Sequence, residues 1–279
     1  MQIPPIHHPL HATVRIPGSK SLTNRALLVA ALARGRTRLT NALFSDDSCY
    51  FAKALRTLGF DIELDEAQRE MIVTGLGGTI PASHAELFIG NAGTAARFLS
   101  AFLTLGKGEY VLDGDARMRE RPIGDLVDGL AQLGAKLETT GQCPPVKVIA
   151  SGLPGGKTKI AGNISSQFLS AILMVAPYAT SPVDIEVITD LNSKPYVDMT
   201  LAIMQDFGVQ VEHQGYQHFN IQPSFFFPLT SYPIESDASA ASYFFAAPAI
   251  CGGTVRVENI SRASRQGDIA FLDVLQQMG

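Results

Sequence analysis

The stretch PGSKSLTNR, residues 17–25, gathers side chains that can hold an anion. It contains Lys20, Ser21 and Arg25, and it runs directly into the apolar residues 26–33. Cations and hydroxyl groups at one place supply charge-assisted hydrogen bonds, which are the strong hydrogen bonds to phosphate and carboxylate groups. The spacing therefore predicts a site for a multiply anionic small molecule at the start of a buried helix.

Two later stretches have the same design, small polar residues followed by an apolar run. They begin the segments NAGTAARFLSAFL, residues 91–103, and ISSQFLSAILMV, residues 164–175. A helix N-terminus has unpaired N–H groups and roughly half a positive charge, so each start is a candidate anion site. The residues that qualify are Asn91, Gly93, Thr94 and Arg97 in the first segment and Ser165, Ser166 and Gln167 in the second.

These stretches belong to a repeat that runs along the whole sequence. One sequence pattern, the end of a predicted helix followed by glycine, occurs four times. The four segments are ALRTLGFDIE, GLAQLGAKLE, IMQDFGVQVE and VLQQMG. Its glycines, Gly59, Gly134, Gly208 and Gly279, are separated by 75, 74 and 71 residues. Such regular spacing indicates four copies of one structural unit in which the glycine ends a helix.

Each copy has the same order of elements before its glycine. An amphipathic helix, such as residues 123–133 with Pro122 in its first turn, comes directly before the glycine. It is preceded by a strand and, earlier, by an apolar helix. The predicted strands are residues 37–43, 109–115, 183–189 and 254–260, and the predicted apolar helices are residues 19–33, 91–103, 164–175 and 237–250. This order predicts an α/β fold (α+β in its segregated sheets) with helices covering the sheets.

The arrangement of the copies decides whether their helix starts can act together. If a pseudo-threefold axis relates three copies, the N-termini of their apolar helices converge on one ligand. The fourth copy has no strand after Gly279, whereas the other three continue into FDIE, AKLE and VQVE. We therefore expect the sequence to be the front part of a longer protein.

Composition limits the classes of partner. The 279 residues include 46% hydrophobic and 17% charged residues, which is typical of a folded protein with room for two domains. A net charge of −4 argues against a nucleic-acid or membrane surface, because those surfaces need an extended basic stripe. A local cluster must therefore hold any anion. No signal-peptide pattern and no apolar run of membrane-spanning length occurs, so we expect a cytoplasmic protein.

Metal and nucleotide sites are not indicated. His7, His8 and His11 lie among prolines without the periodicity of metal ligands, so we predict no metal. The three cysteines, Cys49, Cys143 and Cys251, are far apart and suggest neither a disulfide framework nor a zinc site. The stretch GLPGGKT, residues 152–158, resembles the end of a P-loop, but its first glycine is missing and no helix pattern follows.

Purely structural roles remain open for the candidate anion-site residues and for three later residues. Lys20 and Arg25 can be a solvated helix start, and serine and asparagine are ordinary capping residues. Ser193 can cap the helix that has Pro195 in its first turn, and Tyr196 can serve only in packing. Asp237 can be a cap, a hinge residue or a ligand contact.

Six motifs in order carry a resemblance to a known family. They are PGSKSLTNRALLVAALA, LFIGNAGTAARFL, RMRERPIGDLVDGL, GNISSQFLSAIL, NSKPYVDMTL and SDASAASYF. Together they resemble the 5-enolpyruvylshikimate-3-phosphate synthases over essentially the whole sequence. The resemblance implies the enolpyruvyl transferase fold, with six βαβαββ units and three units to a domain. Here it implies one complete domain, residues 19–236, and parts of a second, residues 1–18 and 237–279.

The resemblance also implies a reaction and its residues. The 5-hydroxyl of shikimate 3-phosphate adds to C2 of phosphoenolpyruvate, C3 takes a proton, and phosphate leaves, without metal or organic cofactor. The implied shikimate 3-phosphate ligands are Lys20, Ser21, Arg25, Ser165, Ser166, Gln167, Ser193 and Tyr196. The implied phosphoenolpyruvate ligands are Lys20, Asn91, Gly93, Thr94, Arg121 and Gln167. Lys20 is the implied catalytic residue, since it touches both substrates and assists protonation or the departure of phosphate.

The sequence departs from the family pattern at two points. Phe98 stands where many members have proline. The catalytic aspartate and further acid/base and basic ligands of the family fall beyond Gly279, so we expect residues 1–279 to bind shikimate 3-phosphate as a monomer without a complete catalytic set. One alternative is the related enolpyruvyl transfer to a UDP-amino sugar, for which asparagine rather than Ser21 is expected after Lys20. The other is a non-catalytic domain that binds phosphate ligands.

Overall fold

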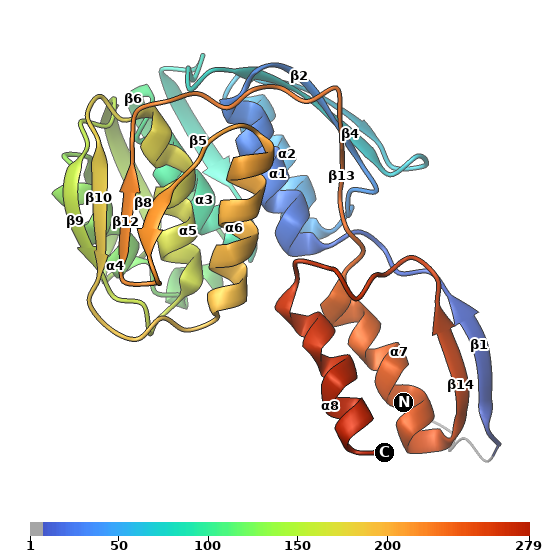
Figure 1. Cartoon of the computed structure of the whole chain (residues 1–279). Coiled ribbons are helices and arrows are strands. Elements are labelled where there is room, and N and C mark those ends of the chain that lie inside the picture. Colours follow the sequence, from blue (N-terminus) through green and yellow to red (C-terminus); the bar gives the residue numbers. More distant parts are fainter. Residues whose placement is uncertain (1–7) are drawn as a thin grey trace.

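The computed structural model describes residues 8–279 and confirms an α/β fold. A larger body carries most of the strands and helices, and a smaller body formed by both ends of the described chain lies at one end of it (Figure 1). His7 lies outside the described residues, and His8 and His11 are exposed. Every helix in residues 8–279 is too short or too polar to span a bilayer. The same residues contain no cluster of three or more His, Cys, Asp or Glu side chains that could hold a metal ion.

Three four-stranded sheets form the larger body and share one topology. In each sheet the outer two strands on one side are parallel, and the remaining pairs are antiparallel. The first sheet has the order β13 (Ser231–Pro233), β2 (Arg34–Thr40), β4 (Glu70–Leu76), β3 (Asp61–Asp65). The second has the order β5 (His84–Phe88), β6 (Lys107–Asp113), β8 (Cys143–Ser151), β7 (Lys136–Thr140). The third has the order β9 (Gly156–Ile160), β10 (Val183–Val187), β12 (His218–Ile221), β11 (Glu212–Gln214). The sequence repeat is therefore a structural repeat.

Two helices accompany each sheet of the larger body. The first helices of the three units are α1 (Lys20–Leu32), α3 (Gly93–Leu103) and α5 (Ser166–Val175). The second helices are α2 (Asp46–Thr57), α4 (Gly124–Gln132) and α6 (Lys194–Asp206), and two 3-10 turns are η1 (Met118–Glu120) and η2 (Ala176–Tyr178). The first helices are buried along 11 of 13, all 11 and 9 of 10 residues, including polar residues of their first turns, so they form the centre of the body.

Glycine ends the second helix of every unit, as predicted. Gly59, Gly134 and Gly208 each lie two residues after the helix and have φ angles of +95°, +90° and +88°. Only glycine adopts this left-handed conformation without a steric penalty. The prediction for Pro122 was wrong: α4 begins at Gly124 after the N-cap residue Ile123, so Pro122 precedes the helix. The first predicted strand is also displaced, because β2 begins at Arg34 rather than at residue 37.

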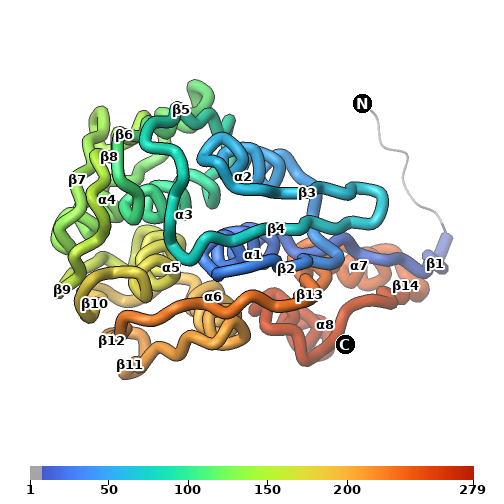
Figure 2. Tube along the Cα trace, turned by 90° about the horizontal axis from the view of Figure 1, so that it is seen from above, coloured from blue at the N-terminus to red at the C-terminus, as the bar shows by residue number. Residues whose placement is uncertain are grey.

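The smaller body consists of two strands and two helices. They are β1 (Leu10–Val14), α7 (Ala238–Cys251), β14 (Gly253–Val257) and α8 (Phe271–Gln277), with the 3-10 turn η3 (Gly267–Ala270) before α8. Strand β1 precedes α1 in the sequence but pairs with β14, and β13 precedes α7 but pairs with β2. The chain therefore crosses twice between the bodies, and the crossing segments run side by side through the bridge between Gly18 and Ser236 (Figure 2).

Candidate anion-binding site

One cavity of about 410 Å³ lies where the N-termini of four helices meet. Lys20 and Ser21 come from α1, and Thr94 comes from α3. The other lining residues come from α5 and α6 or from the loops before them: Ile164, Ser165, Ser166, Gln167, Asn192, Ser193 and Tyr196. Eight of the twelve residues predicted for the site therefore line one cavity. The other four, Arg25, Asn91, Gly93 and Arg121, are not in its lining.

The helices begin at this cavity with little capping by their own N-cap side chains. The N-cap residues of α1 and α3, Ser19 and Ala92, make no side-chain capping hydrogen bond. Ser165 does cap α5, because its hydroxyl accepts a hydrogen bond from the N–H of Gln167 at 3.2 Å. Such N-termini combine donor groups with the positive end of the helix dipole. The capping role left open for Asn91 is absent from α3, whose N-cap residue is Ala92.

Ser193 shows a second departure from simple capping. It occupies the N-cap position of α6, but its side chain makes no capping hydrogen bond and its φ is +55°. A non-glycine residue in the left-handed region costs conformational energy, and such residues concentrate at functional sites. The structure therefore does not support capping as the reason for serine at this position.

Arg25 lies behind the cavity and donates hydrogen bonds to the main chain of residues that line it. Only 1% of the residue is exposed. The guanidinium donates hydrogen bonds to the Thr200 hydroxyl at 2.7 Å, to the carbonyl of Ser21 at 3.0 Å and to the carbonyl of Tyr196 at 3.1 Å. Burial lowers the pKa of Arg25 to about 10, against an opposing contribution from Tyr196. Arg25 therefore connects two residues that line the cavity, through their main chains.

Arg121 forms a second cluster beside Thr94. Its Nη1 donates to the carbonyl and to the side-chain oxygen of Asn91, at 3.1 and 3.2 Å. A β-carbon on Gly93 would lie only 2.3 Å from Nη2 of Arg121, so the guanidinium covers the glycine directly. Gln167 joins this cluster to the cavity, because its side-chain amide donates to the Thr94 hydroxyl at 3.3 Å. The two predicted ligand groups are thus adjacent.

The cations here lack the acidic partners found elsewhere. Within residues 8–279, none of the ion pairs includes Lys20, Arg25, Arg97 or Arg121. A charge removed from water without a counter-charge is costly, so a bound anion stabilises the buried guanidinium groups. The cluster is therefore electropositive in a protein of net charge −4.

Two polar side chains make contacts that the sequence did not predict. Arg97, one of the residues of the predicted anion site at the start of α3, is 5% exposed and donates to the carbonyls of Gly93 and Pro122. Asp237 bridges two helices: one carboxylate oxygen accepts from the N–H of Lys20 at 3.1 Å and the other from that of Ala240 at 2.8 Å. Its predicted capping role is confirmed for α7, but its contact with α1 had no local signal in the sequence.

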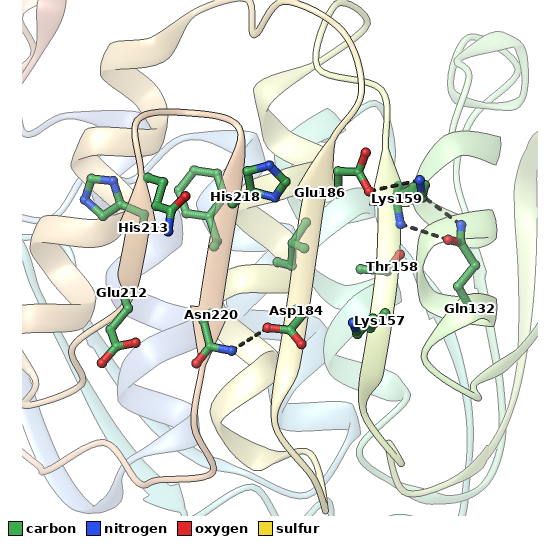
Figure 3. Close-up of a pocket in the computed structure, with 13 residues that line it drawn as sticks. Gln132, Lys157, Thr158, Lys159, Asp184, Glu186, Glu212, His213, His218 and Asn220 are labelled. Carbon is green, nitrogen blue, oxygen red and sulfur yellow. Dashed lines mark hydrogen bonds and ion pairs between the residues drawn. The ribbon is translucent and has the colours of Figure 1, made fainter.

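A larger hollow of about 820 Å³ lies on the outer face of the third sheet (Figure 3). Lys159 pairs with Glu186 at 2.9 Å, and the neutral amide of Asn220 donates to Asp184. Side chains from four neighbouring strands form a mixed-charge face, and none of the lining residues begins a helix. Volume alone therefore does not identify the anion site.

Comparison with known proteins gives a consistent family. A sequence model described as EPSP synthase (3-phosphoshikimate 1-carboxyvinyltransferase) matches residues 5–279. A 3-phosphoshikimate 1-carboxyvinyltransferase of Sulfurovum sp. is 52% identical over 97% of this chain and 64% of its own length. A chloroplastic enzyme of that name from Solanum lycopersicum is 50% identical over 97% of this chain and 54% of its own.

A solved structure agrees with the sequence comparisons. EPSP synthase from Acinetobacter baumannii superimposes with a TM-score of 0.81 at 28% identity, over 96% of this chain and 59% of that one. The chain therefore spans more than half, but less than two thirds, of the length of these three relatives. From the family match and the shared fold, the chain belongs to the EPSP synthase family.

Proposed function

We propose that this chain serves in the transfer of the carboxyvinyl group of phosphoenolpyruvate to the 5-hydroxyl of shikimate 3-phosphate, the chorismate-forming branch of aromatic amino acid synthesis. The observation that carries the proposal is the meeting of four helix N-termini and Lys20 at one 410 Å³ cavity, with Arg25 behind the cavity and Arg121 beside it. Both substrates are small and multiply anionic, which is what such a cavity binds. The relatives' names favour this reaction over enolpyruvyl transfer to a UDP-amino sugar.

The cavity is assigned to shikimate 3-phosphate. Ser165, Ser166 and Gln167 present hydroxyl, amide and main-chain donors at the start of α5, suited to its phosphate and ring. The remaining ligands proposed for this substrate are Lys20, Ser21, Arg25, Ser193 and Tyr196. Arg25 has a second N–H on Nη1 beyond the one that it donates to Ser21, and it also fixes the main chain on two sides of the cavity.

Phosphoenolpyruvate is assigned to the adjacent cluster. Arg121 clamps the phosphate, and the main chain at Gly93 and Thr94, where α3 begins, supplies further donors. Asn91 holds Arg121, and Gln167 faces both substrates. Lys20 lies at the start of α1, where its ammonium group contacts both ligands and donates a proton as phosphate departs. The 5-hydroxyl oxygen bonds to C2 and gives up its proton while C3 gains one. The bond from C2 to the phosphate oxygen then breaks as C3 loses a proton, which restores the carbon–carbon double bond in the product.

We also propose how the chain is divided into domains. Residues 19–236 form one complete domain, and residues 1–18 and 237–279 contribute to a second domain. The acid/base groups implied by the family resemblance are not in this sequence, so residues 1–279 bind shikimate 3-phosphate and release no phosphate. The protein is proposed to act in the cytoplasm as a monomer.

Calorimetry and a phosphate assay test this proposal. Titration with shikimate 3-phosphate is expected to show one site, and Lys20→Met is expected to weaken it about tenfold, the scale of one charge-assisted hydrogen bond. Lys157→Met is the matched control, because Lys157 is exposed on the outer sheet face (Figure 3). No heat with the unaltered chain contradicts the binding proposal, and phosphate release from both substrates contradicts the proposed lack of turnover.

A further inference from the structure

The buried side chain of Arg97 joins two segments of the candidate site, one at Gly93 and one at Pro122. It lies in the first turns of α3, and only 5% of it is exposed. Its Nη1 donates to the carbonyl of Gly93 at 3.1 Å, and its Nη2 donates to the carbonyl of Pro122 at 2.7 Å. The guanidinium lies over the ring of Phe168 from α5, with 6.0 Å between its central carbon and the ring centroid. One buried side chain thus fixes the main chain at both segments.

The same two segments meet again at Arg121. Pro122 follows Arg121 directly, so the bond from Arg97 holds the main chain next to that residue. On the other side, Arg121 donates to Asn91 and lies over Gly93. The two arginines therefore connect the segments at residues 91–93 and 121–122 from opposite sides, and only Arg121 is open to a ligand.

We infer that Arg97 is a positioning residue, which holds the Arg121 guanidinium over the main chain at the start of α3 and thereby shapes the phosphate site. The ligand named here, phosphoenolpyruvate, rests on the proposed function. The placement of Arg121 by Arg97 rests on the hydrogen bonds alone.

Electrostatics distinguishes this role from simple packing. Burial first, and then the charge of Arg121, lower the pKa of Arg97 to about 10, against an opposing contribution from Cys143, so the two cations repel each other in the free protein. An anion bound beside Arg121 offsets that repulsion. A residue that served stability alone would be placed away from a second cation, or beside a carboxylate. Arg97 is instead placed where its charge is useful once a ligand is bound.

Side-chain NMR of ¹⁵N-arginine-labelled protein tests the placement without any ligand. The Nε–H signal of Arg121, assigned by its loss in Arg121→Lys, is expected to be rigid in the unaltered protein. In Arg97→Lys it is expected to become mobile, because one ammonium group cannot reproduce two divergent guanidinium bonds. Arg56→Lys is the matched control, since Arg56 also donates two bonds to a main-chain carbonyl, that of Ile62, far from the site. A rigid, unshifted Arg121 signal in folded Arg97→Lys overturns the inference.

A milder variant keeps the test valid if Arg97→Lys does not fold. Phe168→Leu retains both arginines and removes the aromatic face under Arg97. It is expected to increase the mobility of Arg121 partially, and no change of that signal overturns the inference.

Ligand binding gives the second readout. In the presence of saturating shikimate 3-phosphate, Arg97→Lys is expected to weaken phosphoenolpyruvate at least tenfold while the affinity for shikimate 3-phosphate changes less than twofold. Equal weakening of both ligands overturns the selective role. If the unaltered protein binds neither ligand, the proposed function fails, while the NMR comparison still decides the placement of Arg121.

Discussion

Helices of similar composition have different surroundings in the two bodies. Helices α1, α3 and α5 of the larger body are buried almost completely, whereas only Ala238 and Ala241 of the 14 residues of α7 are buried. In the smaller body Tyr243 is 78% exposed and Ile250 is 81% exposed. The comparison shows that an apolar sequence selects a helix, while the neighbouring sheets decide whether that helix belongs to a core.

Topology explains the difference. Helices α1 and α3 each contact other helices and a four-stranded sheet, and α5 packs against α3, α4 and α6. Strand β13 completes the first of these sheets. In the described residues α7 has only the two-stranded sheet of β1 and β14, together with η3 and α8. The larger body therefore has the packing needed for a rigid site, and the smaller body has much less.

Hydrogen exchange should show the largest contrast between the bodies. Amides in the middle of α1, α3 and α5 are expected to exchange at least a thousandfold more slowly, relative to unstructured rates, than those of α7 and α8, because local opening needs little free energy where few apolar groups are buried. Mass spectrometry of peptides from both bodies measures this ratio. Similar protection from hydrogen exchange in α3 and α7 would contradict the proposed difference in packing between the two bodies.

Truncation of one buried side chain should have the next largest effect. Leu27 in α1 is 0% exposed, so Leu27→Ala is expected to lower the free energy of unfolding by about 3 kcal/mol or more. Ile250→Ala in α7 is expected to change it by less than about 0.5 kcal/mol. Urea unfolding followed by circular dichroism gives both values, and equal losses would contradict the difference in packing.

Alkaline pH should weaken the larger body selectively. Burial raises the pKa of Tyr178 to about 12, against opposing effects of the Phe226 N–H and Arg34. A raised pKa stabilises the folded state below the ordinary tyrosine pKa, and this contribution is lost as the pH rises from about 10 to about 12, roughly 2 kcal/mol in all. The pH dependence of unfolding should therefore be shallower in Tyr178→Phe. Tyr243→Phe, which removes an exposed hydroxyl in α7, should retain the slope of the unaltered protein.

Substitution of Gly93 should have the smallest effect, and on binding only. An added β-carbon meets the flexible end of Arg121, so Gly93→Ala is expected to displace that guanidinium and weaken phosphoenolpyruvate by about 1.4 kcal/mol, or tenfold. Gly252, after α7, has a φ of +73° and open space at the β-carbon position. Gly252→Ala should therefore lower stability by strain and leave binding unchanged. Calorimetric titration of both variants measures the affinity for phosphoenolpyruvate, and calorimetric unfolding measures their stability.

The sequence predicted what is local or periodic. The glycine spacing predicted the repeat, and the small polar residues before the apolar runs predicted the helix N-termini at the cavity, because both depend on neighbouring residues. It did not predict that Asp237 bridges α1 and α7 or that Arg97 reaches Pro122, because these contacts depend on the crossing of the chain and on how α3 packs beside the next segment. The left-handed Ser193 also had no signal, since serine is common at ordinary caps.

The binding position of shikimate 3-phosphate tests the central claim most directly. Amide NMR during a titration with this ligand reports every main-chain N–H that the anion approaches. We predict that the largest shifts occur at Ser21, Thr94, Ser166 and Gln167, the starts of three different helices. Shifts concentrated instead at Lys157, His218 and their neighbours on the outer face of the third sheet, or no shifts at millimolar ligand, would contradict it.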